Sequence, residues 1–405
     1  MIPVEDALAR ITGALRTMPA EQVPLADSFG RVLAVDVASR RTQPPLAVSA
    51  MDGYAVRAED VAKIPVTLRL IGTVPAGQAY DGTVGAGEAV RIFTGAPVPH
   101  GADAIVIQEN TEAADGAVKV VDGMAPKGRY VRAAGLDFHA GDVLLRAGRV
   151  LTARDIGLAA GMNVPWLMVR RRPRVALLAT GDEIVMPGDP LGANQIVSSN
   201  ALALACMIRA CGGEAIDLGI APDSADALKA MAEGARGADM LVTTGGASVG
   251  DHDLIRQVLG NIGLEVDFWK IAMRPGKPLI FGHIGDTPLL GLPGNPVSAL
   301  VCGTLFLRPA IMTMLGADAE VNRPLDAVLV EGLPENDERQ DYLRATLSRG
   351  PGGILQAAAF AKQDSSVFSG MAQADGLVVR APHAPPAKAG DTVTVIRLGG
   401  SLFSI

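Results

Sequence analysis

Residues 174–316 alternate short apolar runs with helix-like segments, and this alternation limits the possible folds more than any other feature of the chain. Arg174–Thr180 is an unbroken apolar run, which is typical of a strand buried on both faces. Further strands are expected at 239–244 and 278–281, with helices at about 200–211, 224–236 and 253–260. We therefore predict a parallel α/β domain over residues 174–321.

Three glycine-containing loops follow or adjoin the apolar runs of this domain. They are Thr-Thr-Gly-Gly-Ala-Ser-Val-Gly (243–250), Met-Arg-Pro-Gly-Lys-Pro (273–278) and Leu-Pro-Gly-Asn-Pro-Val-Ser-Ala (292–299). Ligands of α/β domains bind beyond the carboxyl ends of the strands, where glycine allows close approach and helix N-termini attract anions. None of the loops matches the phosphate loop of nucleotide hydrolases or the dinucleotide-binding pattern.

The loops therefore predict a site for an anionic, phosphate-bearing ligand, in which Arg274 and Lys277 supply full positive charges. The candidate ligand-binding residues are Thr244, Gly245, Gly246, Ser248, Gly250, Arg274, Lys277, Pro293, Gly294, Asn295 and Pro296.

Acidic residues lie at the ends of several expected strands. Glu183, Asp223 and Asp253 belong to the α/β domain, and Asp52 lies in Ser-Ala-Met-Asp-Gly-Tyr-Ala-Val (49–56). Carboxylates beside a phosphate site make sense if Mg²⁺ bridges the two, but Asp223 and Asp253 could equally cap helices. No Ser-His-Asp or Cys-His pairing can be argued, so a covalent mechanism is disfavoured.

The rest of the chain divides into three further parts. Residues 46–139 show short alternating strands with glycine turns and are expected to form a β-rich lobe. The segments 1–45 and 140–173, which begin with an amphipathic helix at 3–17, are expected to form a helical linker domain. Residues 322–405 return to short strands and predict a small C-terminal β domain.

Charge and composition exclude several classes of function. The net charge of −7 argues against nucleic-acid binding, and three cysteines give no disulfide framework. The uncharged apolar stretch 157–169 is too short to span a bilayer, and the N-terminus lacks the pattern of a signal peptide. We therefore expect a cytoplasmic protein with no membrane or nucleic-acid partner.

At the level of motifs, the sequence resembles the MoeA family of molybdopterin molybdenumtransferases, which includes the gephyrin E domain. The matching segments occur in the family's order along the whole chain. They are residues 49–56, Arg-Ile-Phe-Thr-Gly-Ala-Pro-Val-Pro (91–99), Thr-Gly-Asp-Glu (180–183), 244–250, 273–279, 292–299, Tyr-Leu-Arg (342–344) and Ala-Asp-Gly-Leu (374–377). Two departures are Ala47-Val48 before the first motif and Ser198 where the family often has aspartate.

The resemblance implies an elongated, four-part homodimer whose α/β domain resembles the molybdopterin-binding fold of the MogA enzymes. It implies Mg²⁺-dependent insertion of molybdate into adenylylated molybdopterin with release of AMP. Its functional residues fall on Asp52, Thr94, Glu183, Asp223 and Asp253, of which Asp52, Glu183 and Asp253 are the expected metal ligands.

The family's dimer also implies active sites shared between two subunits. Other enzymes of cofactor biosynthesis are further expected partners. Two alternatives remain: a molybdopterin adenylyltransferase, which would need only the α/β domain, and a non-catalytic scaffold of the gephyrin type. A preference for tungstate over molybdate also stays open.

Overall fold

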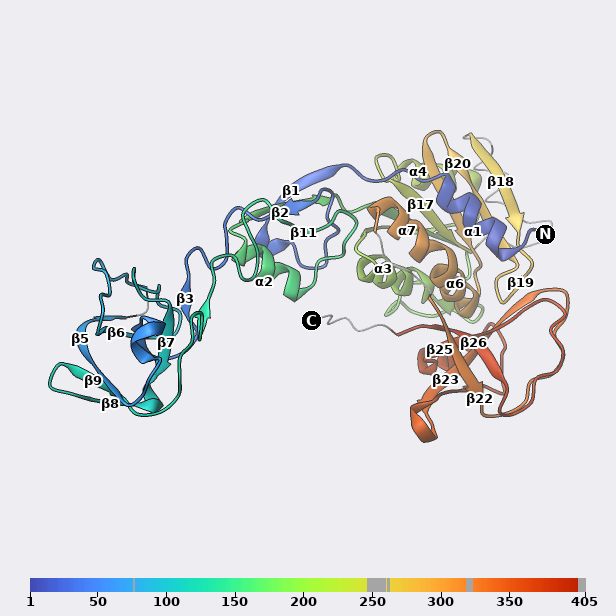
Figure 1. The fold of residues 1–405 in the computed structure, drawn as a ribbon. Helices are drawn as coiled ribbons and strands as arrows, with labels where there is room; N and C mark the ends of the chain where they lie inside the picture. The colour runs from blue at the N-terminus through green and yellow to red at the C-terminus, as the bar shows by residue number, and fades with distance from the viewer. Residues whose placement is uncertain (76, 246–259, 261–262, 318–322, 400–405) are drawn as a thin grey trace.

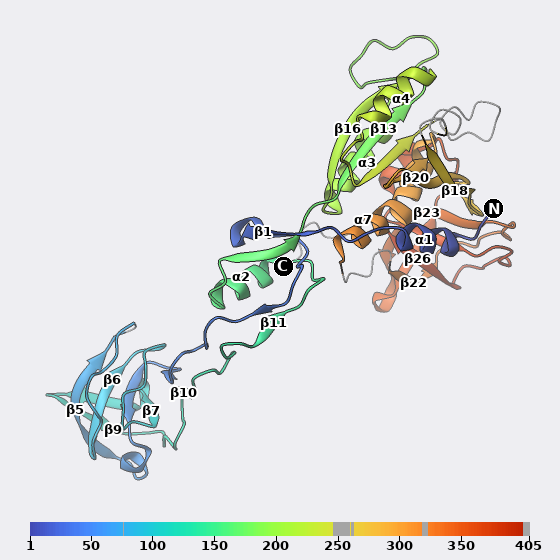
Figure 2. The same ribbon diagram turned by 90° about the horizontal axis from the view of Figure 1, so that it is seen from above.

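The chain forms an elongated series of domains in its computed structural model (Figure 1). The structure describes residues 1–405 except 76, 246–259, 261–262, 318–322 and 400–405. The β-rich lobe occupies one end, the linker domain the middle, and the α/β domain with the C-terminal β domain the other end. Figure 2, turned by 90°, shows the same separation of the lobe from the α/β domain. The predicted elongated, multi-domain fold is confirmed.

The β-rich lobe is built on a six-stranded sheet in the order β7-β4-β6-β5-β9-β8. Its elements are β4 (Gly53–Val56), η2 (Ala58–Val61), β5 (Val66–Val74), β6 (Glu88–Ile92), β7 (Ala104–Ile107), η3 (Gln108–Asn110), β8 (Thr111–Ala114) and β9 (Ala117–Val120). At the neck of the lobe, β3 (Val48–Ser49) pairs with β10 (Val131–Arg132). Val56 of β4 belongs to one apolar cluster of the lobe, and its neighbour Ala55 belongs to another. Successive side chains of a strand point to opposite faces of the sheet, so the two clusters lie on opposite faces.

The linker domain joins segments from both sides of the lobe. β1 (Ala20–Pro24) pairs antiparallel with β12 (Trp166–Arg170), and β2 (Val37–Ala38) pairs with β11 (Val143–Leu145). The 3₁₀ turn η1 (Leu25–Asp27) and helix α2 (Ala153–Gly161) complete it. A capping box between Thr152 and Asp155 starts α2, so the first helical N–H groups are satisfied locally.

The α/β domain contains a six-stranded sheet in the order β16-β13-β17-β21-β20-β18. The strands of this sheet are β13 (Arg174–Thr180), β16 (Glu214–Ala221), β17 (Met240–Thr244), β18 (Leu264–Lys270), β20 (Pro278–Ile284) and β21 (Thr287–Leu292). Three short strands of the domain lie outside this sheet: β14 (Ile184–Val185), β15 (Ile196–Val197) and β19 (Met273–Arg274). Its helical segments are α3 (Asn200–Ala210), α4 (Ala225–Glu233), α6 (Pro296–Cys302), the π turn η4 (Gly303–Leu307) and α7 (Arg308–Leu315). The helix predicted at 253–260 lies outside the described residues, apart from Gly260.

The sheet of the predicted parallel α/β domain is antiparallel at one edge. β16, β13, β17 and β21 are parallel, but β20 runs antiparallel to β21 and to β18. Only Gly285 and Asp286 separate β20 from β21. So short a connection can make a hairpin but cannot cross over the sheet, as a parallel neighbour would require.

Both faces of the parallel part of the sheet are covered. Along β13, Val175 and Leu177 enter one apolar cluster, and Ala176 and Leu178 enter another on the opposite face. This explains why Val175–Ala179 is apolar at every position rather than at alternate ones. Pro296–Leu315 is, among the described residues, the single helix long and apolar enough to cross a bilayer, but 78% of its most apolar window is buried in the protein. It is therefore a core helix here.

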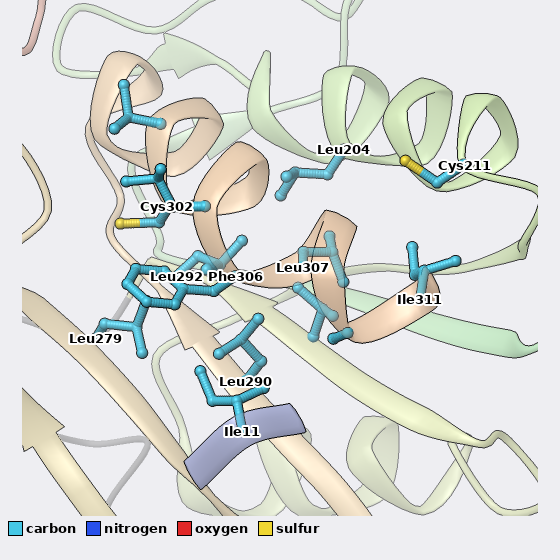
Figure 3. Packing of buried hydrophobic residues seen from close by; sticks show 14 of the residues in the cluster. Ile11, Leu204, Cys211, Leu279, Leu290, Leu292, Cys302, Phe306, Leu307 and Ile311 are labelled. Atoms are coloured by element: carbon cyan, nitrogen blue, oxygen red, sulfur yellow. The ribbon is translucent and has the colours of Figure 1, made fainter. Parts of the chain in front are cut away.

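The N-terminal helix α1 (Val4–Gly13) packs on the α/β domain, although residues 1–45 were assigned to the linker domain. Ala7 and Ile11 are fully buried in the same cluster as Leu290 of β21 and Phe306 of η4. Figure 3 shows Ile11 beside Leu290 within this cluster. The amphipathic pattern predicted the helix but could not identify the surface that covers its apolar face, so the domain boundary differs there.

The C-terminal domain is a closed barrel that abuts the α/β domain. Its sheet runs β19-β23-β24-β22-β26-β25, and β23 also pairs with β25 to close it. The elements are β22 (Pro324–Leu329), β23 (Gln340–Arg349), η5 (Pro351–Gly353), β24 (Leu355–Ala359), α8 (Phe368–Gln373), β25 (Gly376–Arg380) and β26 (Thr392–Arg397). Because β19 belongs to the loop 273–278, this pairing joins a predicted ligand loop directly to the barrel.

Candidate functional site

A cleft of about 900 Å³ lies where the carboxyl ends of the α/β strands meet the barrel. Many of the predicted ligand-binding residues line it, together with one predicted acid. They are Glu183, Thr244, Gly245, Arg274, Lys277, Pro293, Gly294, Asn295 and Pro296. The loops at 243–250, 273–278 and 292–299 therefore meet in space, as far as they are described. Gly246, Ser248, Gly250 and Asp253 lie outside the described residues.

Two of the loops are fastened together by Asn200, the first residue of α3. Its Nδ2 donates to Thr244 Oγ1 at 3.0 Å and to the Gly294 carbonyl at 2.7 Å. The N-termini of α3 and α6 both border the cleft, so their partial positive charges are directed toward a bound anion. The sequence indicated Asn200 as a possible N-cap of this helix, but its role as a tie between loops needed the structure, because its partners lie 44 and 94 residues farther along the chain.

Glycine is required at Gly245 by the close approach of two chain segments. Its φ is +93°, and a Cβ there would lie 2.4 Å from the Thr180 carbonyl oxygen. A Cβ on Gly294 would lie 3.5 Å from Gly245 Cα, so the loops that follow β17 and β21 touch through their backbones. The N–H groups of Gly294 and Asn295 donate to no other group in the described part of the chain. These donors are thus free to bind an oxyanion.

The two predicted cationic residues of the cleft differ in their surroundings. Arg274 pairs with Asp341 and, at 3.0 Å, with Asp337, both from the barrel. The hydrogen bond to Asp341 raises the pKa of Arg274, so its charge is already balanced. The ammonium of Lys277, by contrast, has no ion-pair or hydrogen-bond partner among the described residues. Lys277 is thus the cation that an anionic ligand can use without displacing a carboxylate.

Glu183 presents an exposed carboxylate at the cleft wall. A Cβ on Gly181 would lie 2.5 Å from Glu183 Oε2, which shows that the carboxylate folds back over that glycine. Asp223 lies on the neighbouring loop, where its N–H donates to Asp182 Oδ1 at 2.9 Å, and it does not line the cleft. Within the described residues, no group of three or more His, Cys, Asp or Glu side chains is arranged to hold a metal.

The barrel supplies a wall of the cleft that sequence reasoning missed. Ser365 Oγ accepts a hydrogen bond of 2.9 Å from Asn295 Nδ2. Asp364 Oδ1 accepts from the Ser366 hydroxyl at 2.5 Å and from the Ser366 N–H at 2.8 Å, and these bonds lower the pKa of Asp364. Gln363 also lines this wall.

The loop that carries this wall is held by the buried Arg344 on β23. Its guanidinium donates to the carbonyls of Val367 at 2.8 Å, Asp364 at 3.0 Å and Lys362 at 3.2 Å. Burial lowers the pKa of Arg344. The sequence signal was present in the Tyr-Leu-Arg segment at 342–344, but nothing in it indicated which loop the arginine would hold.

Asp52 and Thr94 lie together at the other end of the molecule, in the β-rich lobe (Figure 1). Asp52 Oδ1 accepts hydrogen bonds from the Thr94 N–H and the Thr94 hydroxyl, each at 2.7 Å. The backbone bond first, then the hydroxyl bond, lowers the pKa of Asp52, and the nearby charge of Arg91 adds to the effect. Neither residue lines the cleft of its own chain.

Comparison with known protein families matches three parts of the chain. Residues 2–162 match the MoeA N-terminal region (domain I and II), residues 176–313 match a "Probable molybdopterin binding domain", and residues 326–398 match the MoeA C-terminal region (domain IV). The matched regions together cover most of the sequence, including both ends of the elongated molecule.

Individual relatives agree with these matches. A molybdopterin molybdenumtransferase from Nostoc sp. is 40% identical over 73% of this chain and 70% of its own. One from Bacillus subtilis is 33% identical over 98% and 94%. The crystal structure of the molybdopterin biosynthesis MoeA protein from Pyrococcus horikosii superposes with a TM-score of 0.85 at 34% identity, covering 99% of this chain and 100% of that one.

Proposed function

The chain belongs to the MoeA family, and from that premise we propose that it acts in molybdenum cofactor biosynthesis as a molybdopterin molybdenumtransferase. It inserts molybdate into adenylylated molybdopterin and releases AMP. The observation that carries the proposal is the cleft at the carboxyl ends of the sheet. There the free ammonium of Lys277 and the unused N–H groups of Gly294 and Asn295 surround a space large enough for a phosphorylated ligand.

Hydrolysis of a phosphoanhydride depends on charge neutralisation and positioning more than on a protein nucleophile. The two N–H groups and Lys277 are suited to hold non-bridging phosphate oxygens and to stabilise the negative charge that develops as the bond breaks. Asn200 fixes the position of the Gly294 loop relative to Thr244. The N–H groups of Gly294 and Asn295 are therefore already in place before the ligand binds. Arg274, which is paired with Asp341 and Asp337, mainly anchors the cleft to the barrel.

We also propose Mg²⁺ as a cofactor of the reaction. The fit rests on Glu183, an exposed cleft carboxylate to which no described residue donates a side-chain hydrogen bond. Mg²⁺ is usually held by one or two carboxylates together with phosphate oxygens and water, so a single free carboxylate that lines the same cleft as the phosphate donors is a suitable set. When bound, the ion would neutralise phosphate charge; Glu183 would hold it, while Asp253 and Asp52 stay predicted ligands.

The proposed active unit is a homodimer with shared sites. Asp52 and Thr94 belong to the lobe and do not line the cleft of their own chain. Figure 2 shows the lobe well separated from the α/β domain. The two residues can therefore act on the ligand only if another subunit's cleft meets them. The outward face of β12 presents Trp166 at 50% and Met168 at 37% exposure. Apolar side chains on a strand face are a suitable surface for subunit contact. A cytoplasmic location and contacts with other cofactor-biosynthesis enzymes stay predictions.

The alternatives are not favoured. A molybdopterin adenylyltransferase would need only the α/β domain, whereas the MoeA family regions also cover residues 2–162 and 326–398. A purely structural scaffold would not need the free cation and backbone donors of the cleft.

The test is the release of AMP from adenylylated molybdopterin by the purified protein, with and without molybdate. We expect release that depends on molybdate and Mg²⁺. A parallel reaction with molybdopterin and ATP should form no adenylate. Adenylate formation, or an absence of AMP release with fresh substrate, would overturn the proposal. Replacing molybdate with tungstate in the same assay decides the metal preference.

A further inference from the structure

Arg91, on β6 of the lobe, lies next to the pair formed by Asp52 and Thr94. Its guanidinium is placed over two aromatic rings, 4.9 Å from the centroid of Tyr54 and 5.1 Å from that of Phe93. Both distances are within the range of favourable cation–π contact. Tyr54 is the cross-strand partner of Arg91, so the sheet register itself fixes one side of this arrangement.

The hydrogen bonds of Arg91 reach Gly53, which follows Asp52 in the chain, and Gln108, which is bonded to the Asp52 backbone. One nitrogen donates to the Gly53 carbonyl at 3.3 Å, and another donates to Gln108 Oε1 at 2.5 Å. The backbone N–H of Gln108 in turn donates to the backbone carbonyl of Asp52 at 3.1 Å. Arg91, Gln108 and the backbone of residues 52–53 therefore form a closed ring of contacts, and this ring holds the backbone from which the Asp52 side chain extends.

We propose that Arg91 is a positioning residue that holds Asp52 against Thr94, with Gln108 as its intermediary. This inference rests on the proposed role of Asp52 in the reaction. The planar fork of arginine suits it, because one side chain reaches two acceptors while its face packs on aromatic rings. A lysine would keep the positive charge but could neither bridge the two acceptors nor stack in the same way.

Charge alone does not explain the arrangement. The lowered pKa of Asp52 is caused first by the two bonds from Thr94, and the charge of Arg91 is a smaller cause. The main contribution of Arg91 is then geometric, because it keeps the carboxylate in reach of both Thr94 donors. A small displacement of a reacting group can reduce a rate by up to about 100-fold, so positioning by itself can matter greatly.

The experiment compares Arg91→Met, Arg91→Lys and Gln108→Ala in the full-length protein. The matched control is Arg69→Met, which removes an exposed arginine of the same sheet that pairs with Glu88 rather than with the Asp52 network. For Arg91→Met we expect a kcat reduced about 10- to 100-fold with KM changed less than about twofold. Arg91→Lys should recover little of this loss. Gln108→Ala should lower kcat in the same direction but by less.

Two further readouts separate positioning from other roles. In an Asp52→Ala background, Arg91→Met should cause no additional loss; a further loss of the same size would show that Arg91 acts on the substrate directly. The Thr94 amide resonance should shift in Arg91→Met and not in Arg69→Met. Because this signal needs no substrate, an unchanged Thr94 resonance overturns the inference even if the proposed reaction is correct, whereas a shifted resonance supports it even if the reaction is not.

Discussion

The lobe and the cleft both present polar side chains suited to catalysis, but they differ in how far these groups are already satisfied. In the lobe, the Asp52 carboxylate accepts two hydrogen bonds from Thr94, and Arg91 and Gln108 fix its backbone. In the cleft, Lys277 and the N–H groups of Gly294 and Asn295 have no partner in the described part of the chain. The lobe thus already satisfies its proposed catalytic pair with hydrogen bonds, while the cleft leaves donors that a ligand can bind.

This difference indicates distinct roles for the two ends. Unpaired donors bind a ligand most strongly where they need not first break another contact, so affinity should depend mainly on the cleft. A carboxylate that is already oriented adds little binding but can act on a group placed next to it. Substitutions at the two ends should therefore have separable effects on binding and on turnover.

The largest expected effect tests whether the two ends act together across subunits. Asp52→Ala and Lys277→Ala homodimers should each be nearly inactive. In a mixed heterodimer one site carries both changes and the other carries neither, so activity should return to about half of wild type per dimer. The measurement is AMP release by heterodimers purified with two affinity tags. Heterodimers as inactive as their parents would place the working site within one chain.

Lys277→Ala should produce the largest loss for a single cleft side chain. We expect kcat/KM to fall about 100-fold, because one ammonium facing a buried phosphate can contribute a few kcal/mol. The remaining binding should also become less sensitive to salt. Lys229→Ala, on the exposed surface of α4, is the matched control and should leave both values unchanged. Equal salt dependence for wild type and Lys277→Ala would remove Lys277 from the binding site.

Asn200→Asp should loosen the cleft while preserving side-chain shape. The change removes the donors to Thr244 and Gly294, and each net hydrogen bond contributes about 1 kcal/mol. We expect faster hydrogen exchange at the start of α3 and a raised KM. Ser199→Ala, whose hydroxyl only approaches Asn200 Oδ1 at 3.5 Å, should change both much less. If hydrogen exchange at α3 is unaltered in Asn200→Asp, the hydrogen bonds of Asn200 to the two loops do not stabilise the cleft.

The effect of Thr94→Val on stability should be the smallest of these changes, confined to the lobe and to a defined pH range. It removes the hydroxyl bond that helps lower the pKa of Asp52, so that pKa should rise toward its ordinary value. A lowered folded-state pKa stabilises the protein above the unfolded-state pKa of about 3.9, and this stabilisation is lost as the pH falls through the folded value. Thr94→Val should therefore be less stable than wild type at neutral pH, with the difference vanishing in acid.

Thermal unfolding of the lobe from pH 7 down to pH 3 measures this difference. Thr67→Val, at an exposed position of β5, serves as the control for replacing a threonine hydroxyl by a methyl group. A Thr94→Val deficit that persists unchanged at pH 3 would show that the hydroxyl acts through packing rather than through Asp52.

Much of the fold was predictable because its signals are local. The unbroken apolar run at Arg174–Thr180 predicted a doubly covered strand, and the structure buries its residues in two clusters on opposite faces. The four-part division also followed from changes in periodicity. Two expectations failed for different reasons. The helix α1 packs on the α/β domain, far along the chain, and the two-residue connection after β20 forms a hairpin that reverses the edge of the sheet.

The candidate site was predictable in its residue types but not in its partners. Arg274 and Lys277 looked equivalent in the sequence, three residues apart in one loop. The barrel carboxylates Asp337 and Asp341 pair with Arg274 and leave Lys277 free. Those acids lie more than sixty residues farther along the chain, so no local pattern could have indicated the difference.

The sequence by itself determined the elements, the glycine loops and the chemistry of an anion site, because periodicity and backbone freedom act over a few neighbouring residues. Only the tertiary structure decided which charges remain unpaired, which loop Arg344 holds, and that Asp52 and Thr94 lie apart from the cleft of their own chain. These outcomes depend on how strands pair and domains meet, and such contacts join residues that the chain separates widely.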